Sequence, residues 1–202
     1  MMKHATLMKV FGSIAVLGAA SSVAALGTFA SFTSSTSASQ AISSGSVSIA
    51  LGATGAANRL TVAASGLVPG DTVQRAVDLT SASTDPLGSV SLQTSGAPNN
   101  ALLTDANGLT VKVDKCSSAW TESGTAPAYT YTCSGTSTSI LAAGAVGNTA
   151  ALSGLAALSS GSSTDHLLVT LALPAAATNT LQGLSTSITY AFNGTQRTAT
   201  SK

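Results

Sequence analysis

Charged side chains are scarce in this chain. Asp, Glu, Lys and Arg make up 7% of its 202 residues, against about 25% in an ordinary soluble domain. Beyond residue 30, six basic residues are scattered among seven acidic ones, so that part carries a net charge of −1. Nucleic-acid binding depends on clustered Lys and Arg that neutralise phosphates. We therefore expect no nucleic-acid partner.

Aromatic residues are also few, at 4% of the chain, so a core must consist mainly of Val, Leu, Ile and Ala. Gly, Ser and Thr are abundant, which is common in disordered chains, but disorder usually comes with low hydrophobicity and a high net charge. Here the hydrophobic fraction is 44% and the formal charge of the whole chain is +1. The composition favours a folded protein with a nearly neutral surface.

Candidate catalytic residues are almost absent. The chain has two histidines, His4 and His166, and a single glutamate, Glu122. A zinc protease of the H-E-x-x-H type needs two imidazoles one helical turn apart, and a serine nucleophile elbow needs a G-x-S-x-G motif; the sequence has neither. We expect His166 at the start of a strand on the rim of the fold. We predict no catalytic residue, no metal and no cofactor, and a protein that is not an enzyme.

The acidic residues could supply the paired carboxylates of glycoside hydrolysis. Most of them stand near Gly, Ser or Asn, in turn-like segments where Asp is favoured because its side chain bonds the local backbone. We interpret them as solvated turn residues. They are Asp71, Asp78, Asp85, Asp105, Asp114, Glu122 and Asp165.

The one long apolar run lies near the amino terminus, from Val10 to Ala30, behind a short basic start. A basic start, an apolar run and small residues before a cut are typical of a secretory signal. We predict a signal peptide over residues 1–30, cut between Ala30 and Ser31, with Ala25 as the second choice. The alternative is an uncleaved anchor, because the run is about long enough to span a bilayer. Either way we expect a secreted or cell-surface protein.

Export makes the two cysteines interpretable. Cys116 and Cys133 both lie in the exported part, and in an oxidising compartment an isolated pair most often forms a disulfide. The chain-entropy model assigns such a bridge about 3 kcal/mol of stabilisation. The alternative, a two-cysteine metal site, lacks nearby ligands of the right type. We predict a disulfide between these two residues.

Most of the exported part alternates apolar and polar residues, which is the period-two pattern of half-buried strands. Turns containing Gly, Pro, Asn and Ser separate the runs. About eight to ten such strands predict an all-β, jelly-roll-like β-sandwich over residues 43–202, with short helical turns and preceded by the signal-peptide helix. The runs are 46–51, 59–64, 71–80, 88–94, 108–116, 128–134, 166–174 and 185–200.

Three places fit this pattern less well. Arg75 interrupts the apolar face of its strand, so we expect it at an edge or beside a partner. Asn193-Gly194 inside the last run is a hairpin or bulge signal. Within residues 140–160, leucines recur every third residue from Leu152 to Leu158, which predicts one or two helical turns beside the sandwich.

Residues 116–133, "CSSAWTESGTAPAYTYTC", combine the cysteines with Trp120, Tyr129 and Tyr131. These aromatic side chains either pack over the disulfide with their polar tips in water, or face a ligand and stack on sugar rings. The second interpretation supports an alternative function, that of a secreted carbohydrate- or cell-wall-binding module.

Two segments carry a family resemblance. "GTFASFTSSTSASQAISSGSVSIAL", residues 27–51, resembles the amino-terminal signature of the TasA/camelysin family, in which a dedicated signal peptidase cuts within G-T-[WF]-A-x-F and a first strand follows. "GLVPGDTVQRAVDL", residues 66–79, resembles the family's N/G-L-x-P-G-D turn. "VDKCSSAW…YTC" and "HLLVTLALP" are similar to actinobacterial-type, SipW-dependent secreted matrix proteins of the family.

The resemblance implies an exported jelly-roll protein that polymerises into fibres of a biofilm matrix, the amino-terminal strand of one subunit completing the sheet of the next. We assign that role to residues 31–42, a flexible segment with Phe32 as an apolar plug and Ile42 at its far end. The implied partners are further copies of the chain, the signal peptidase, and the cell wall or an accessory matrix protein. The family is also labelled with metalloendopeptidase activity, but no catalytic residue is transferred because the required histidines are missing.

Overall fold

The computed structural model describes residues 46–61 and 66–199. They belong to one compact unit, Ser44–Lys202. The other unit, Met1–Ser43, lies outside the described residues, and the predicted signal peptide lies there with it. In the part of the chain that is described, no helix has the length and apolarity needed to cross a bilayer.

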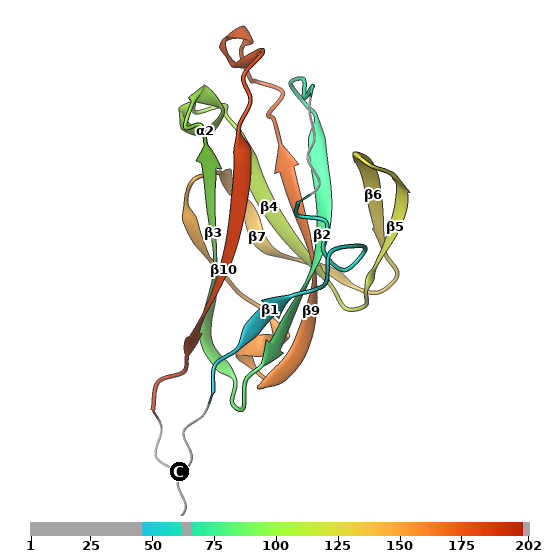
Figure 1. The fold of residues 1–202 in the computed structure, drawn as a ribbon, viewed down its shortest axis with the longest axis vertical. Coiled ribbons are helices and arrows are strands. Elements are labelled where there is room, and N and C mark those ends of the chain that lie inside the picture. Colours follow the sequence, from blue (N-terminus) through green and yellow to red (C-terminus); the bar gives the residue numbers. More distant parts are fainter. Residues whose placement is uncertain (1–45, 62–65, 200–202) are drawn as a thin grey trace, which may run out of the picture. The chain divides into compact units, whose positions relative to one another are not determined.

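Antiparallel strands make up most of the described chain (Figure 1). A five-stranded sheet contains, in spatial order, β1 (Ile49–Leu51), β2 (Thr72–Ala82), β9 (Ser162–Ala172), β4 (Thr110–Cys116) and β7 (Ser137–Ala145). A three-stranded sheet contains β10 (Ser187–Gln196), β3 (Leu87–Ala97) and β8 (Thr149–Leu152). Strands β5 (Trp120–Thr125) and β6 (Ala128–Cys133) form a separate hairpin, and α2 (Ala101–Thr104), η1 (Ala156–Leu158) and η2 (Asn179–Leu181) are single short turns.

The five-stranded and three-stranded sheets enclose one apolar core. Every second residue of a strand points inward, and these residues join a single cluster of buried side chains. Burying one Val or Leu side chain stabilises the fold by about 1.5–3 kcal/mol. The prediction of an all-β sandwich is confirmed. The largest of its fully buried side chains are Val77 and Leu79 of β2, Val90 and Leu92 of β3, Val113 of β4, and Leu167 and Val169 of β9.

The prediction of one or two helical turns within residues 140–160 is confirmed for a single turn and is wrong beyond it. The chain there forms β7 and β8, and the one helical element is the short η1. The leucine spacing has another cause, because Leu152 ends β8 and Leu155 lies in the following loop, yet both are buried. A strand end, a loop and a turn can each place one leucine in the same core.

Two further expectations need correction. The run 59–64 is not a strand over its described part, since Asn58 makes one isolated bridge to Val77 and a turn follows. Asn193-Gly194 is not a hairpin turn but lies within β10, and the register irregularity comes just after it, between Thr195 and Gln196. A Cβ on Gly194 would lie 3.3 Å from the side chain of Ile49, so glycine there admits a close contact with β1.

Candidate functional site

The free edge of β10 is the longest regular strand edge that the described chain leaves open. On one side β10 pairs with β3 in unbroken register from Ser187 to Thr195, and no described strand pairs with its other side. Natural proteins usually protect such an edge with charges, proline, bulges or short strands. The ten residues of β10 contain neither a charge nor a proline. This edge therefore presents a row of main-chain donors and acceptors to an incoming strand.

An apolar hollow lies beside this edge, between the two sheets. A cavity of about 240 Å³ there adjoins a second of about 320 Å³, because both are lined by Leu67, Leu109 and Thr186. We call this hollow, together with the free edge of β10, the β10 groove. Its other walls are Leu60, Thr61, Val73, Arg75, Leu171, Ser187, Ile188 and Tyr190 in the first cavity, and Gly66, Leu102, Leu173, Leu181, Gly183, Leu184 and Ser185 in the second.

On the side of β2 away from β9, no strand of the described chain pairs with the residues before Ala76. β1 covers Leu79–Ser81 of β2, and the backbone N–H of Arg59 donates to the carbonyl of Ala76 at 2.9 Å. Backbone groups of alternate residues point to the same edge, so the carbonyl of Gln74 faces this side too. It accepts a hydrogen bond of 2.7 Å from the guanidinium of Arg75. Arg75 was expected at an edge or beside a partner, and its buried guanidinium has a partner in this carbonyl.

The groove combines a buried cation, Arg75, with a phenol that is shielded from water. Burial raises the pKa of the Tyr190 phenol above its ordinary value of 10, and the neighbouring Arg75 charge partly opposes that rise. A raised phenol pKa reflects a medium that disfavours charge. The groove therefore suits uncharged, partly apolar side chains.

The β5–β6 hairpin is clamped to the sandwich beside the groove. The Nε and Nη2 atoms of Arg59 donate to the two carboxylate oxygens of Glu122 at 2.8 and 2.7 Å, a two-point geometry that strengthens such a pair. The hydroxyl of Tyr131 donates to Glu122 at 2.9 Å. The guanidinium of Arg59 also lies 4.8 Å from the ring centre of Tyr129. We call these four residues the hairpin clamp.

The pKa values of the clamp follow from these contacts. The hydrogen bond from Arg59 lowers the pKa of Glu122 below its ordinary 4.5, and burial opposes that shift. Burial first, and then the hydrogen bond to Glu122, raise the pKa of Tyr131 to about 12. At neutral pH the clamp therefore holds an ionised carboxylate, a charged guanidinium and a neutral phenol.

The cysteines and the aromatic residues predicted from sequence come together in this hairpin. Cys116 and Cys133 form the predicted disulfide at its base. The indole N–H of Trp120 donates to the carbonyl of His166 at 3.1 Å, and the hydroxyl of Tyr131 is bonded within the clamp. The side chains of Trp120, Tyr129 and Tyr131 are all half-buried. The polar tips of Trp120 and Tyr131 are bonded inside the protein, and the ring of Tyr129 lies against Arg59 and Arg75. Sugar binding by the three residues stays a prediction.

The prediction of solvated turn positions is wrong for several acidic residues. Asp165 is 1% exposed in β9, where its carboxylate accepts from the backbone N–H of Ala156 at 2.8 Å and lies 3.0 Å from the Nζ of Lys115. Asp78, Asp114 and Glu122 also lie within strands. The sequence contained one signal for the burial of Asp165. This residue lies an even number of positions before Leu167 and Val169, and alternate residues of a strand point to the same face, here the inward one.

His166 is not at the start of a strand, because it is the fifth residue of β9. Its Nδ1 atom lies 2.7 Å from a carboxylate oxygen of Asp78 on the neighbouring strand. His166 and Asp165 are adjacent in the strand and so point to opposite faces. The histidine is therefore part of a cross-strand pair on the outer face of the five-stranded sheet.

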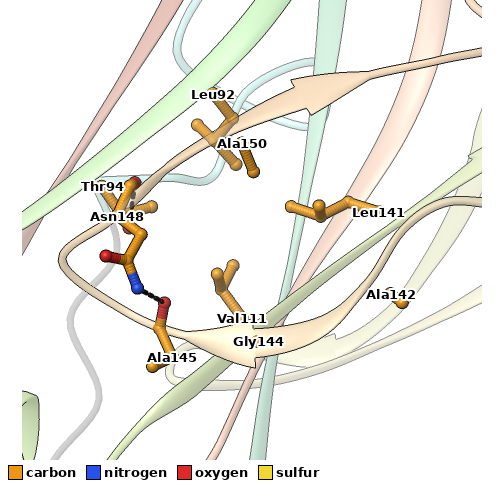
Figure 2. Close-up of a pocket in the computed structure, with 9 residues that line it drawn as sticks. All are labelled: Leu92, Thr94, Val111, Leu141, Ala142, Gly144, Ala145, Asn148 and Ala150. Carbon is orange, nitrogen blue, oxygen red and sulfur yellow. Dashed lines mark hydrogen bonds between the residues drawn. The ribbon is translucent and has the colours of Figure 1, made fainter.

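A second opening of the sandwich lies between the edges of β7 and β8 (Figure 2). It has a volume of about 110 Å³, and the side chains of Leu92, Val111 and Leu141 surround it. The amide of Asn148 donates to the carbonyl of Ala145 at 3.3 Å at one end. Strand β8 has four residues, and the pairing of β7 with β4 has two register irregularities. This opening is shallow and its strand edges are short or uneven.

Four of the predicted functional residues cannot be placed. The cleavage residues Ala30 and Ser31 and the assembly residues Phe32 and Ile42 lie outside the described residues. Their roles stay predictions.

The residues present do not fit a metal centre of the kind that the family label metalloendopeptidase implies. Within residues 46–61 and 66–199, no three His, Cys, Asp or Glu side chains come together to hold a metal ion. His166 is engaged with Asp78, and both cysteines are in the disulfide. The donor set of the described fold thus offers no arrangement through which a metal-dependent hydrolysis can be derived.

The chain was compared with known proteins and with protein-family models. No curated protein matches the chain. A family model described as camelysin metallo-endopeptidase matches residues 6–201, which is nearly the whole sequence. The predicted kinship is confirmed: the chain belongs to the TasA/camelysin family.

Proposed function

We propose that this protein is exported and assembles into fibres of an extracellular, biofilm-type matrix. In this proposal residues 31–42 of one copy, freed by cleavage after Ala30, add as a strand to the β10 groove of the next copy. The observation that carries it is the regular, uncharged edge of β10 beside an apolar hollow. Strand addition obtains affinity from main-chain hydrogen bonds and specificity from pockets for alternate side chains.

The sequence of the proposed incoming segment is complementary to the groove. "SFTSSTSASQAI", residues 31–42, has no charged residue. In an extended strand every second side chain lies on the same face, so Phe32 and Ile42 would both face the groove, ten residues apart. The stretch 32–42 has eleven residues, and β10 has ten. The two ends of the segment thus nearly match the length of the edge that would receive it.

The geometry of the described unit favours head-to-tail addition. The described chain begins at Ser46, and the carbonyl of Ser48 accepts from Ala82 at one end of β2. The groove lies near Arg75, about 23 Å further along β2 at about 3.3 Å per residue, towards the end of the sandwich that carries α2 (Figure 1). An interface that joins opposite ends of successive copies does not close on itself, so it produces a filament.

The decisive experiment compares the mature protein, beginning at Ser31, with a form that lacks residues 31–42. We expect concentration-dependent fibres by light scattering and electron microscopy from the first, and none from the second. A synthetic 31–42 peptide should bind the shortened form, and its Phe32→Ala, Ile42→Ala variant should bind at least about tenfold more weakly, a loss of ~1.4 kcal/mol. Fibres that form equally well without residues 31–42 would refute the proposal.

The proposal assigns no catalytic or metal-binding residue. Its competitor is carbohydrate or cell-wall binding, which the grouping of Trp120, Tyr129 and Tyr131 on one hairpin supports. Depletion of the protein by insoluble polysaccharide, lost on Trp120→Ala, would favour that competitor. The cell wall and an accessory matrix protein are proposed as partners in addition to further copies of the chain.

A further inference from the structure

Two residues that line the β10 groove come directly after a residue of the hairpin clamp in the sequence. Leu60 and Thr61 line the groove, and Arg59 precedes them in the chain. The segment before them is attached to β2, since Asp78 donates to Ala57 at 2.8 Å and Arg59 donates to Ala76 at 2.9 Å. Arg59 is thus the last described residue of this segment whose backbone bonds to β2, and the groove wall starts at the next residue.

The side chain of Arg59 ties this point to a rigid support. Its two-point pair with Glu122 is partly buried, with side-chain exposures of 24% and 15%. Glu122 lies in β5, and the hairpin is itself held by the Cys116–Cys133 disulfide and by the bond from Trp120 to the carbonyl of His166. The position of Arg59 is therefore determined from two sides, by β2 and by the hairpin.

Arg75 makes a second link between the groove and the hairpin. It lines the groove, and its guanidinium lies 5.7 Å from the ring centre of Tyr129 in the hairpin. Tyr129 thus lies near both arginines. A displacement of the hairpin would shift both contacts together.

We infer that the Arg59–Glu122 pair is a positioning device for the β10 groove. It holds Leu60 and Thr61 in the place where they form the groove wall, and it thereby sets the affinity of the groove for an added strand. The inference rests on the proposed function, because the ligand is the 31–42 segment of a second copy. Glu122 and Arg59 are positioning residues and do not themselves contact the strand.

The test uses Glu122→Gln, with Asp114→Asn as matched control. Asp114 also pairs with a cation, Lys112 at 2.9 Å, and its side chain is likewise 15% exposed, but it lies in β4 away from the groove walls. In the form lacking residues 31–42, we expect Glu122→Gln to speed amide hydrogen exchange over residues 59–61 and to weaken binding of the 31–42 peptide at least about tenfold. Asp114→Asn should change neither quantity.

The outcomes separate the inference from the proposed function. If the unsubstituted protein does not bind the peptide, the proposed function fails, and exchange over residues 59–61 still decides whether the pair positions the wall. Unchanged exchange in Glu122→Gln overturns the inference, and so does faster exchange with unchanged peptide affinity. If the Arg59–Glu122 pair only stabilised the fold, Glu122→Gln would lower the melting temperature and leave the affinity for the 31–42 peptide at 25 °C unaltered. Should Glu122→Gln fail to fold, Tyr131→Phe removes one bond to Glu122 and should shift both quantities in the same direction by less.

Discussion

The strands that border the two openings of the sandwich are alike in having few charges, but the openings differ in geometry, and of the two only the β10 groove is lined by a charged residue, Arg75. Residues 134–164, which contain β7 and β8, have no charged side chain, and neither has β10. Yet the opening at β10 has a regular ten-residue edge and cavities of about 240 and 320 Å³, whereas the opening in Figure 2 has about 110 Å³ between a bulged strand and a four-residue strand. Low charge permits association at an edge, but depth and register decide which edge can hold a strand.

The two openings also differ in support. The hairpin clamp reaches the wall of the β10 groove through Arg59, and the disulfide cross-links the same hairpin. In the described residues no residue of the clamp lines the opening between β7 and β8. Perturbing the hairpin should therefore affect one opening and spare the other.

The largest expected effect comes from removing the disulfide. The Cys116→Ser, Cys133→Ser double variant should lose about 3 kcal/mol of unfolding free energy, because the reduced chain regains loop entropy when unfolded. Urea denaturation measures this loss. Hydrogen exchange should rise in β5 and β6 far more than in β8. A loss below about 0.5 kcal/mol, within the range of an ordinary surface substitution, would contradict the account of the hairpin as a cross-linked support.

The next effect comes from filling each opening in turn. Thr186→Trp places a large side chain where the two cavities of the β10 groove meet, so fibre growth should slow at least about tenfold. Ala150→Leu fills the opening in Figure 2; it should leave growth unchanged and raise stability by up to ~1 kcal/mol. Light scattering and thermal unfolding measure the two responses. Slowed growth in Ala150→Leu with normal growth in Thr186→Trp would reverse the assignment of the openings.

The smallest effect is a pH dependence confined to the hairpin. Because the folded pKa of Glu122 lies below its ordinary 4.5, the stabilisation by its pair with Arg59 is complete above pH 4.5 and is lost as the pH falls through the folded pKa. Trp120, the single tryptophan of the chain, lies in the same hairpin. Its fluorescence should change between pH 5 and pH 3 in the unsubstituted protein. The same change in Glu122→Gln would show that another group is responsible.

Much of the strand content could be predicted because period two is a local property. Alternation located β2, β3, β4, β6, β9 and β10 in the sequence and placed Val77 and Leu79 inward. It failed for β7 and β8, whose Ala, Gly and Ser residues give little contrast between the two faces of a strand. It also missed β5, because Thr, Glu, Ser and Gly there resemble a loop.

The candidate site was less predictable than the fold. The aromatic residues and the disulfide were identified from one short stretch, but the role of Arg59 was not, because its partner Glu122 is 63 residues away. Arg75 was recognised as an interruption of an apolar face. That its guanidinium reaches a carbonyl at an open edge depends on where β1 stops pairing with β2.

By itself, the sequence determined the runs that become strands, the pairing of its two cysteines and its family. The strands and the family signatures are patterns of neighbouring residues, and the disulfide follows from there being only two cysteines. Only the tertiary structure decided which strand edge stays open, how deep the hollow beside it is, and that a clamp supports its wall. Those features depend on the order in which distant strands lie side by side, and alternation along one strand carries no information about its neighbours.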